Sequence, residues 1–103
     1  MTTTIERGFQ LDGGTPGVLG VSGVLSFDTA TAALQAIQAA LPEGAAGHQL
    51  DLAGVRHSDS AGLACVLAAV AAAARRGQAL QVTHMPAGMR TLARVCEVDQ
   101  LIA

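Results

Sequence analysis

The sequence predicts an α/β domain with a small mixed sheet, and three observations lead to this fold class. The chain has 103 residues, half of them hydrophobic and 14% charged, as is typical of one globular domain with a single core. Apolar runs and helical patterns follow in the order strand, strand, helix, strand, helix, strand, helix. The last strand–helix–strand unit is a crossover that predicts parallel pairing, whereas a turn joins the first two strands.

The first predicted strand covers residues 5–11 and is a weak edge strand. Its apolar positions alternate with polar ones and are Ile5, Phe9 and Leu11. Residues 12–17 form a predicted turn, because the glycines allow positive φ and the proline fixes one φ. The second strand spans residues 18–25, where Gly20 and Gly23 indicate a bulge or a close approach of another chain segment.

The first predicted helix begins within residues 26–31, with Asp28 or Thr29 as its N-cap. It runs to about Leu41, and the segment Pro42-Glu43-Gly44 ends it. The apolar stripe at helical spacing consists of Leu34, Ile37 and Leu41. The remaining helix surface holds Ala, Thr and Gln and carries no charge, which is unusual for a face that meets solvent.

The third predicted strand covers residues 48–53 and follows a loop of small residues, 44–47. The second helix covers residues 60–76, and its predicted inner face consists of Leu63, Val66, Leu67, Val70 and Ala74. Its predicted outer face consists of Ala64, Cys65, Ala68, Ala69 and Ala72. A helix that is apolar all round is buried on both sides or meets a partner. Alanine's high helix propensity is a competing explanation for a solvent face filled with Ala.

The fourth predicted strand covers residues 79–83, after Gly77 has stopped the second helix. Pro86 starts a short third helix, since proline is favoured at a first helical position. The side chains expected to pack inward from this helix are Met89, Leu92, Ala93 and Cys96, and Leu101 and Ile102 should close the edge of the core.

A polar turn at residues 58–60 joins the third strand to the second helix and is the part of the chain richest in possible function. Ser58, Asp59 and Ser60 can each accept hydrogen bonds from the free N–H groups of a first helical turn. Gly62 allows the backbone to come close to its neighbour. A serine hydroxyl beside an aspartate at the positive end of a helix suits a phosphate, a partner contact or only a cap.

The segment Asp-Ser-Ala-Gly-Leu (59–63), after the strand Asp51-Leu52-x-x-Val55, resembles the STAS domain of anti-sigma factor antagonists and related modules. Leu63-Ala64 and the segment 91–95 are most similar to MlaB-like members, the STAS subunits of a bacterial ABC complex that moves phospholipid between two membranes. The resemblance covers roughly residues 18–102. It implies a single STAS domain over residues 1–103, with a mixed sheet of four to five strands covered mainly on one side by three helices.

Two functions follow from this resemblance. The first is a non-catalytic subunit that binds and regulates or stabilises an ABC transporter ATPase, which acts together with its permease. The expected partner-binding residues are Thr29, Leu34, Asp59, Ser60, Ala61, Gly62 and Cys65. The alternative is an anti-sigma factor antagonist, in which the partner kinase phosphorylates Ser60. Phosphate at a helix N-terminus is compatible with the fold, so it would act by repelling the partner.

Composition argues against several other classes of function. A net charge of −2, no Trp, no Tyr and only two Phe provide neither a basic field nor a stacking platform for nucleic acid. Without lysine there is no phosphate-binding loop of the ATPase kind, and the serine turn lacks the glycine two residues before the nucleophile of a hydrolase. Cys65 and Cys96 are interpreted as buried small hydrophobes. We therefore expect no enzyme, no cofactor and no metal.

The basic residues are all arginines, and four of them lie late in the chain: Arg75, Arg76, Arg90 and Arg94. They form either a solvated edge that complements helix ends or a patch that faces an acidic partner. The N-terminus has no signal-peptide core, and no apolar run reads as a membrane helix. We expect a cytoplasmic protein that is peripheral to the inner membrane through its partner.

Overall fold

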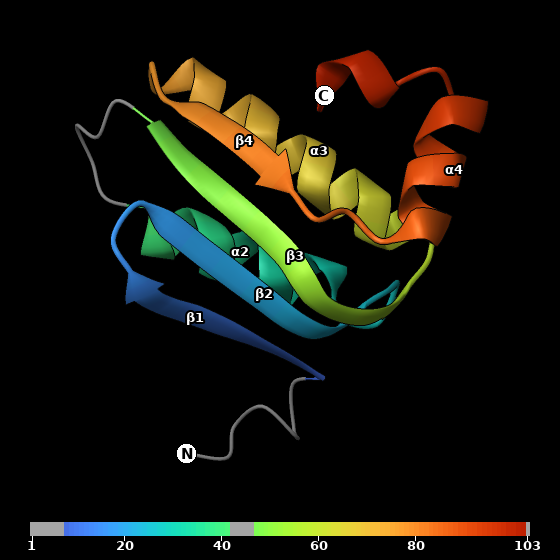
Figure 1. Ribbon diagram of the computed structural model, residues 1–103, viewed down its shortest axis with the longest axis horizontal. Helices are drawn as coiled ribbons and strands as arrows, with labels where there is room; N and C mark the ends of the chain where they lie inside the picture. Colours follow the sequence, from blue (N-terminus) through green and yellow to red (C-terminus); the bar gives the residue numbers. More distant parts are fainter. Residues whose placement is uncertain (1–7, 42–46, 103) are drawn as a thin grey trace.

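The computed structural model describes residues 8–41 and 47–102 and contains a four-stranded mixed sheet (Figure 1). The strands lie side by side in chain order and are β1 (Phe9–Thr15), β2 (Val18–Leu25), β3 (Gly47–Ser58) and β4 (Ala79–Thr83). β1 is antiparallel to β2, whereas β2 with β3 and β3 with β4 are parallel. The predicted mixed sheet is confirmed.

Helices cover mainly one face of this sheet. The helical elements are α2 (Ala30–Ala40), α3 (Ser60–Arg75), α4 (Ala87–Val95) and the short 3-10 helix η1 (Asp99–Leu101). Figure 1 shows α2 and α3 behind the sheet, while α4 and η1 lie beyond β4 and next to α3. Each parallel strand pair is therefore joined by a helix that returns across the same face. This arrangement agrees with the expected STAS fold.

The first strand lies later in the chain than predicted. Phe9 and Leu11 belong to it, but it continues to Thr15, with an irregular register between Asp12 and Thr15. The predicted turn at 12–17 is reduced to Pro16-Gly17, because residues 12–15 remain part of β1. These residues form a bulge, in which the Asp12 side chain accepts a hydrogen bond from the Gly14 N–H. Ile5 lies outside the described residues.

The third strand is about twice as long as the predicted 48–53, because residues 54–58 stay paired with β2. The register shifts after Gly20, so that Gly54 faces Ser22. A Cβ at Gly54 would lie 2.6 Å from the Ser22 Cβ, so the pairing depends on a residue with no side chain. The predicted loop at 44–47 and the helix stop at Pro42-Glu43-Gly44 lie outside the described residues, except for Gly47.

The core lies between the sheet and its helices. Its largest fully buried side chains are Phe9, Val21, Leu25, Ile37, Leu50, Leu52, Val66 and Met89. On α2, Ile37 and Leu41 are buried as predicted, whereas Leu34 is half-buried and Ala33 fills the stripe instead.

The predicted inner and outer faces of α3 are partly wrong. Cys65, Ala69 and Ala72 are buried although they were assigned to the outer face, and Ala74 is exposed although it was assigned to the inner face. The reason is that α3 packs against the sheet and also against α2 and α4, so its buried arc is wider than one helical stripe.

The end of the chain also departs from the prediction. Cys96 is exposed because α4 ends at Val95 and Glu97, at φ 61°, turns the backbone out of the helix. Pro86 is the N-cap of α4 and precedes its first helical residue. Ile102 is buried as expected, but Leu101 is exposed.

Candidate functional site

The predicted site residues gather where β2 and β3 end. These strands are parallel neighbours, and their last residues, Leu25 and Ser58, are paired. The chain leaves both strands at the same edge of the sheet, so α2 and α3 begin side by side (Figure 1). Two short connections, 26–29 and Asp59, therefore control where the two helices start.

Asp59 ties the two connections together. One carboxylate oxygen accepts a hydrogen bond from the Gly62 N–H at 3.1 Å and so caps α3. The other accepts from the Phe27 N–H, also at 3.1 Å, across 32 residues of sequence. These hydrogen bonds, that of Phe27 first, hold the pKa of Asp59 below its usual value because they favour the ionised form.

Ser60 does not cap the helix, contrary to one of its interpretations. Asp59 occupies the N-cap position, and Ser60 is the first residue of α3. Its side chain is exposed, next to the negative charge of Asp59. A hydroxyl at this place is open to a partner or to a modifying enzyme.

Thr29 is a buried residue whose side chain stabilises the first connection, residues 26–29. Only 7% of its surface is exposed, and its hydroxyl donates to the Val24 carbonyl at 2.9 Å while accepting from the Ser26 N–H at 2.9 Å. It is the N-cap residue of α2, as predicted, but its side chain makes no cap hydrogen bond to the helix. Thr29 therefore shapes the connection that carries Phe27 and contributes little surface of its own.

Gly62 also acts through packing. It is buried, and a Cβ built on it would collide with the Leu25 carbonyl group. The first turn of α3 can lie against the end of β2 only because this position has no side chain. The expected close approach of the backbone at Gly62 is confirmed.

A shallow groove of about 320 Å³ separates the first halves of α2 and α3, and we call it the interhelical groove. Its lining is apolar except for one threonine and consists of Phe27, Ala30, Thr31, Leu34, Ala61, Ala64, Cys65 and Ala68. Three of the predicted residues, Leu34, Ala61 and Cys65, thus come together here. Phe27 stands at the groove with 82% of its surface exposed.

The sequence reasoning missed Phe27, although one signal pointed to it. Phe27 is one of only two phenylalanines, and it stands in a polar connection outside any apolar pattern.

Cys65 lies at the bottom of the groove with 3% of its surface exposed, and burial raises the pKa of its thiol to about 11. The thiol is therefore neutral near pH 7 and behaves as a small apolar side chain.

The histidines lie apart from this groove. His84 Nδ1 is 2.9 Å from Asp51 Oδ1 on an exposed part of the sheet, and His57 is exposed on β3. The pKa of Asp51 is lowered by its hydrogen bond from the Ala53 N–H and then by His84. In the part of the chain that the structure describes, no three His, Cys, Asp or Glu side chains gather as metal ligands.

None of the helices within residues 8–41 and 47–102 combines the length and apolar character that crossing a bilayer requires.

Comparison with known proteins places these features in a family context. The model of the family described as "Mlab, STAS domain" matches residues 10–103 of the chain. None of the curated proteins compared with the chain matches it.

Several solved structures are similar in fold. An anti-sigma factor antagonist from Mycobacterium paratuberculosis is 23% identical, with a TM-score of 0.69 and coverage of 89% of this chain and 79% of that one. The anti-sigma factor antagonist SpoIIAA in its unphosphorylated form is 18% identical, with a TM-score of 0.61 and coverage of 84% and 81%. The crystal structure of Mglu is 26% identical, with a TM-score of 0.59 over 76% of this chain, and this chain spans only 19% of that protein.

Proposed function

The chain belongs to the family of Mlab-type STAS domains, and from this premise we propose that it is the non-catalytic STAS subunit of a bacterial phospholipid ABC transporter. In this proposal the chain acts as one STAS domain that binds the cytoplasmic ATPase subunit and stabilises or regulates it. It is cytoplasmic and reaches the inner membrane only through the ATPase and its permease.

The interhelical groove is the observation that carries this proposal. A phenylalanine with 82% of its surface in water loses the free energy that burial of its ring would provide. Aromatic side chains at the centre of an interface often contribute most of the binding energy. The backbone N–H of Phe27 is hydrogen-bonded to Asp59, so the ring projects from an anchored segment rather than from a free loop.

The surroundings of the groove also favour a stable partner. The sequences of α2 and of α3 as far as Ala74 contain no charged residue. Interfaces of permanent complexes are more apolar than those of transient ones. Asp59 and Ser60 are exposed and directly precede Ala61, which lines the groove, so in this proposal they supply a polar rim.

The test is co-purification of the tagged chain from its own host, followed by affinity measurement with the ATPase that is recovered. Phe27→Ala should weaken binding by about tenfold or more, because it removes the exposed anchor of the groove. Val95→Ala is the matched control, since Val95 is 74% exposed but lies on α4, outside the groove. Equal affinities for the two variants would contradict the proposed interface.

Ser60→Asp tests the rim of the same surface. The added charge beside Asp59 should lower affinity for the ATPase without unfolding the domain, because a helix N-terminus accommodates negative charge. If this variant binds the ATPase with unchanged affinity, the proposal that residues 59–62 are part of the interface is wrong.

A second candidate function is an anti-sigma factor antagonist switched by phosphorylation of Ser60. The exposure of Ser60 at the start of α3 supports it, since a kinase could reach the hydroxyl. The same co-purification separates the two functions. Recovery of a histidine-kinase-like anti-sigma factor, with phosphate on Ser60 by mass spectrometry, would favour the switch over the transporter subunit.

A further inference from the structure

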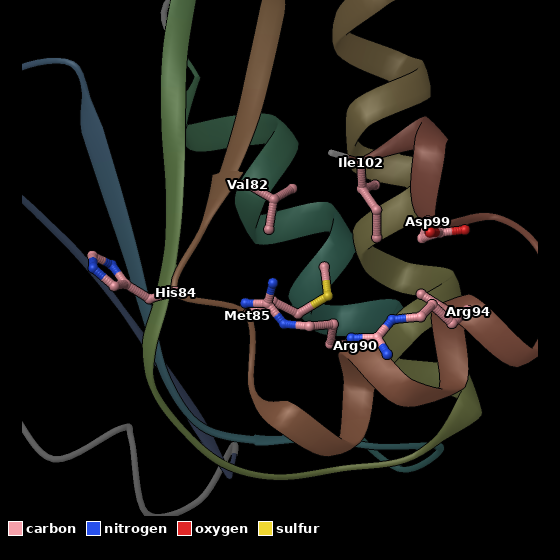
Figure 2. Close-up of a pocket in the computed structure, with 8 residues that line it drawn as sticks. Val82, His84, Met85, Arg90, Arg94, Asp99 and Ile102 are labelled. Carbon is pink, nitrogen blue, oxygen red and sulfur yellow. The ribbon is translucent and has the colours of Figure 1, made fainter.

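A second cavity, of about 280 Å³, lies between the end of β4, α4 and η1 (Figure 2). We call it the α4 pocket. It is lined by Val82, His84, Met85, Arg90, Ala93, Arg94, Asp99 and Ile102, and none of these residues lines the interhelical groove. An inference from this pocket therefore stands apart from the proposed function.

The α4 pocket is apolar inside and basic at its mouth. Ala93 and Ile102 are almost completely buried, and Val82 and Met85 are half-buried beside them. Figure 2 shows the side chains of Arg90 and Arg94 extending from α4 in the same direction, across the pocket and toward the end of β4. A ligand that filled the pocket would thus have an apolar part below two guanidinium groups.

The described residues around the two arginines supply no ion-pair partner for either of them. Among residues 8–41 and 47–102, no carboxylate lies within ion-pair distance of either guanidinium. They stand one helical turn apart, where like charges repel each other. Arg94 complements the C-terminal end of the α4 dipole, but Arg90 lies near the N-terminal end, where a cation is disfavoured.

The other charged groups of the pocket do not neutralise this pair. Figure 2 shows the Asp99 carboxylate directed away from both guanidinium groups. His84 is turned toward Asp51, with its Nδ1 2.9 Å from the carboxylate oxygen. Among the residues that the structure describes, the two positive charges at the mouth of the pocket therefore have no counter-charge.

We propose that the α4 pocket binds a phosphate monoester that carries a compact apolar group. The phosphate dianion matches the two arginine charges, and each planar guanidinium can donate two hydrogen bonds to phosphate oxygens. The apolar group occupies the space next to Met85, Ala93 and Ile102. The half-enclosed volume suits a small ligand or the head region of a phosphate-bearing lipid.

The first experiment titrates the isotope-labelled chain with n-butyl phosphate and follows amide and methyl shifts by NMR. Val82, Met85 and Ile102 should shift in a saturable manner, and inorganic phosphate should bind at least several-fold more weakly because it lacks the apolar part. Arg90→Gln and Arg94→Gln should each weaken binding by about tenfold or more. Arg76→Gln is the matched control, since Arg76 is an exposed arginine at the end of α3.

A second experiment, with lipid vesicles, distinguishes a lipid ligand from a soluble one. Co-sedimentation with phosphatidic acid vesicles that depends on Arg90 and Arg94 would support the pocket with a lipid as its source. Binding of butyl phosphate without vesicle binding would support it with a soluble ligand as its source.

The proposal has clear contrary outcomes. Absence of saturable shifts with butyl phosphate would overturn it, as would equal weakening by Arg76→Gln. Binding of an acidic glutamate-rich peptide without any response to butyl phosphate would also overturn it and assign the arginines to a protein partner.

Discussion

Asp59 is the residue through which the two helix starts become one site. Its carboxylate caps α3 and also accepts the Phe27 N–H, so one side chain sets the beginning of a helix and the position of an exposed aromatic ring. Ser60, one residue later, contributes an exposed hydroxyl. Asp59 thus has a structural role, whereas the hydroxyl of Ser60 is exposed and, under the proposed function, contacts the partner.

Alanine substitution separates these two roles. Asp59→Ala should lower the midpoint of urea unfolding, because it leaves the N–H groups of Gly62 and Phe27 without their acceptor. Ser60→Ala is the matched control and should leave the midpoint nearly unchanged. A larger loss in Ser60→Ala than in Asp59→Ala would mean that the serine is the cap after all.

The sequence located this site but could not assign these roles. Ser58, Asp59 and Ser60 are all good caps, and the choice among them depends on where β3 ends. That strand continues to Ser58 because Gly54 admits the Ser22 side chain, which is a contact between distant segments. Phe27 escaped notice for the same reason, since its importance depends on a hydrogen bond to residue 59.

Among the elements, α3 shows how close contact depends on small side chains. Its first turn rests on the end of β2 at Gly62, and small residues (Gly62, Cys65, Ala69, Ala72 and Ala73) occupy most of its buried positions. The helix can therefore lie near the sheet and also near α2. The interhelical groove is shallow because its walls are built largely from alanine.

Two helical glycines provide a sharp test of this packing. Gly62→Ala should lower the free energy of unfolding by about 1–3 kcal/mol, because the added methyl group collides with the Leu25 carbonyl. Gly88→Ala in α4 should raise it by about 0.5–1 kcal/mol, since nothing lies within 4 Å of that position and alanine favours a helix. Unfolding curves in urea measure both, and equal changes would contradict the close approach at Gly62.

The limits of β2 and β4 could be predicted residue for residue, because turn residues flank each apolar run. The orientation of α3 could not. Alanine is compatible with a buried or an exposed face. The faces of an alanine-rich helix therefore differ little in hydrophobicity, and the sequence does not show which face is buried. The prediction that Cys96 packs inward was wrong because it assumed that the helix includes residue 96, whereas α4 ends at Val95.

At the scale of the whole molecule, Asp51 in β3 and Asp59 directly after this strand connect stability to pH. The pKa values of Asp59 and Asp51 are held below the usual 3.8 by hydrogen bonds that the unfolded chain lacks. A lowered pKa means that the folded state binds fewer protons than the unfolded state in this range. The stabilisation is complete above the usual pKa and disappears as the pH falls through the folded one.

Acid titration should therefore show a loss of stability below about pH 5, with the steepest loss near and below pH 4. Asp59→Asn should weaken this dependence, because asparagine can still cap the helix but does not titrate in this range. Urea unfolding at pH 7, 5, 4 and 3 measures the effect. The same slope in both proteins would show that Asp59 does not contribute to the dependence.

The parallel pairing of β3 with β4 and the mixed character of the sheet could be predicted from the order of elements, because a crossover joins the last two strands and a turn joins the first two. The pairing of β2 with β3 was not predicted. The α4 pocket could not be predicted, because it forms only when η1 folds back beside α4 and brings Ile102 to Val82. Arg90 and Arg94 were visible in the sequence, but their shared cavity was not.

The hydrogen bond between Phe27 and Asp59 also has a consequence for how the chain is made. A ribosome releases residue 27 well before residue 59, so the bond cannot form while only the first half has emerged. The groove needs β3 paired beside β2 and α3 docked, and such distant pairings form late in folding. A nascent or misfolded chain thus lacks the complete interhelical groove, and under the proposed function a partner that binds the groove would select finished chains.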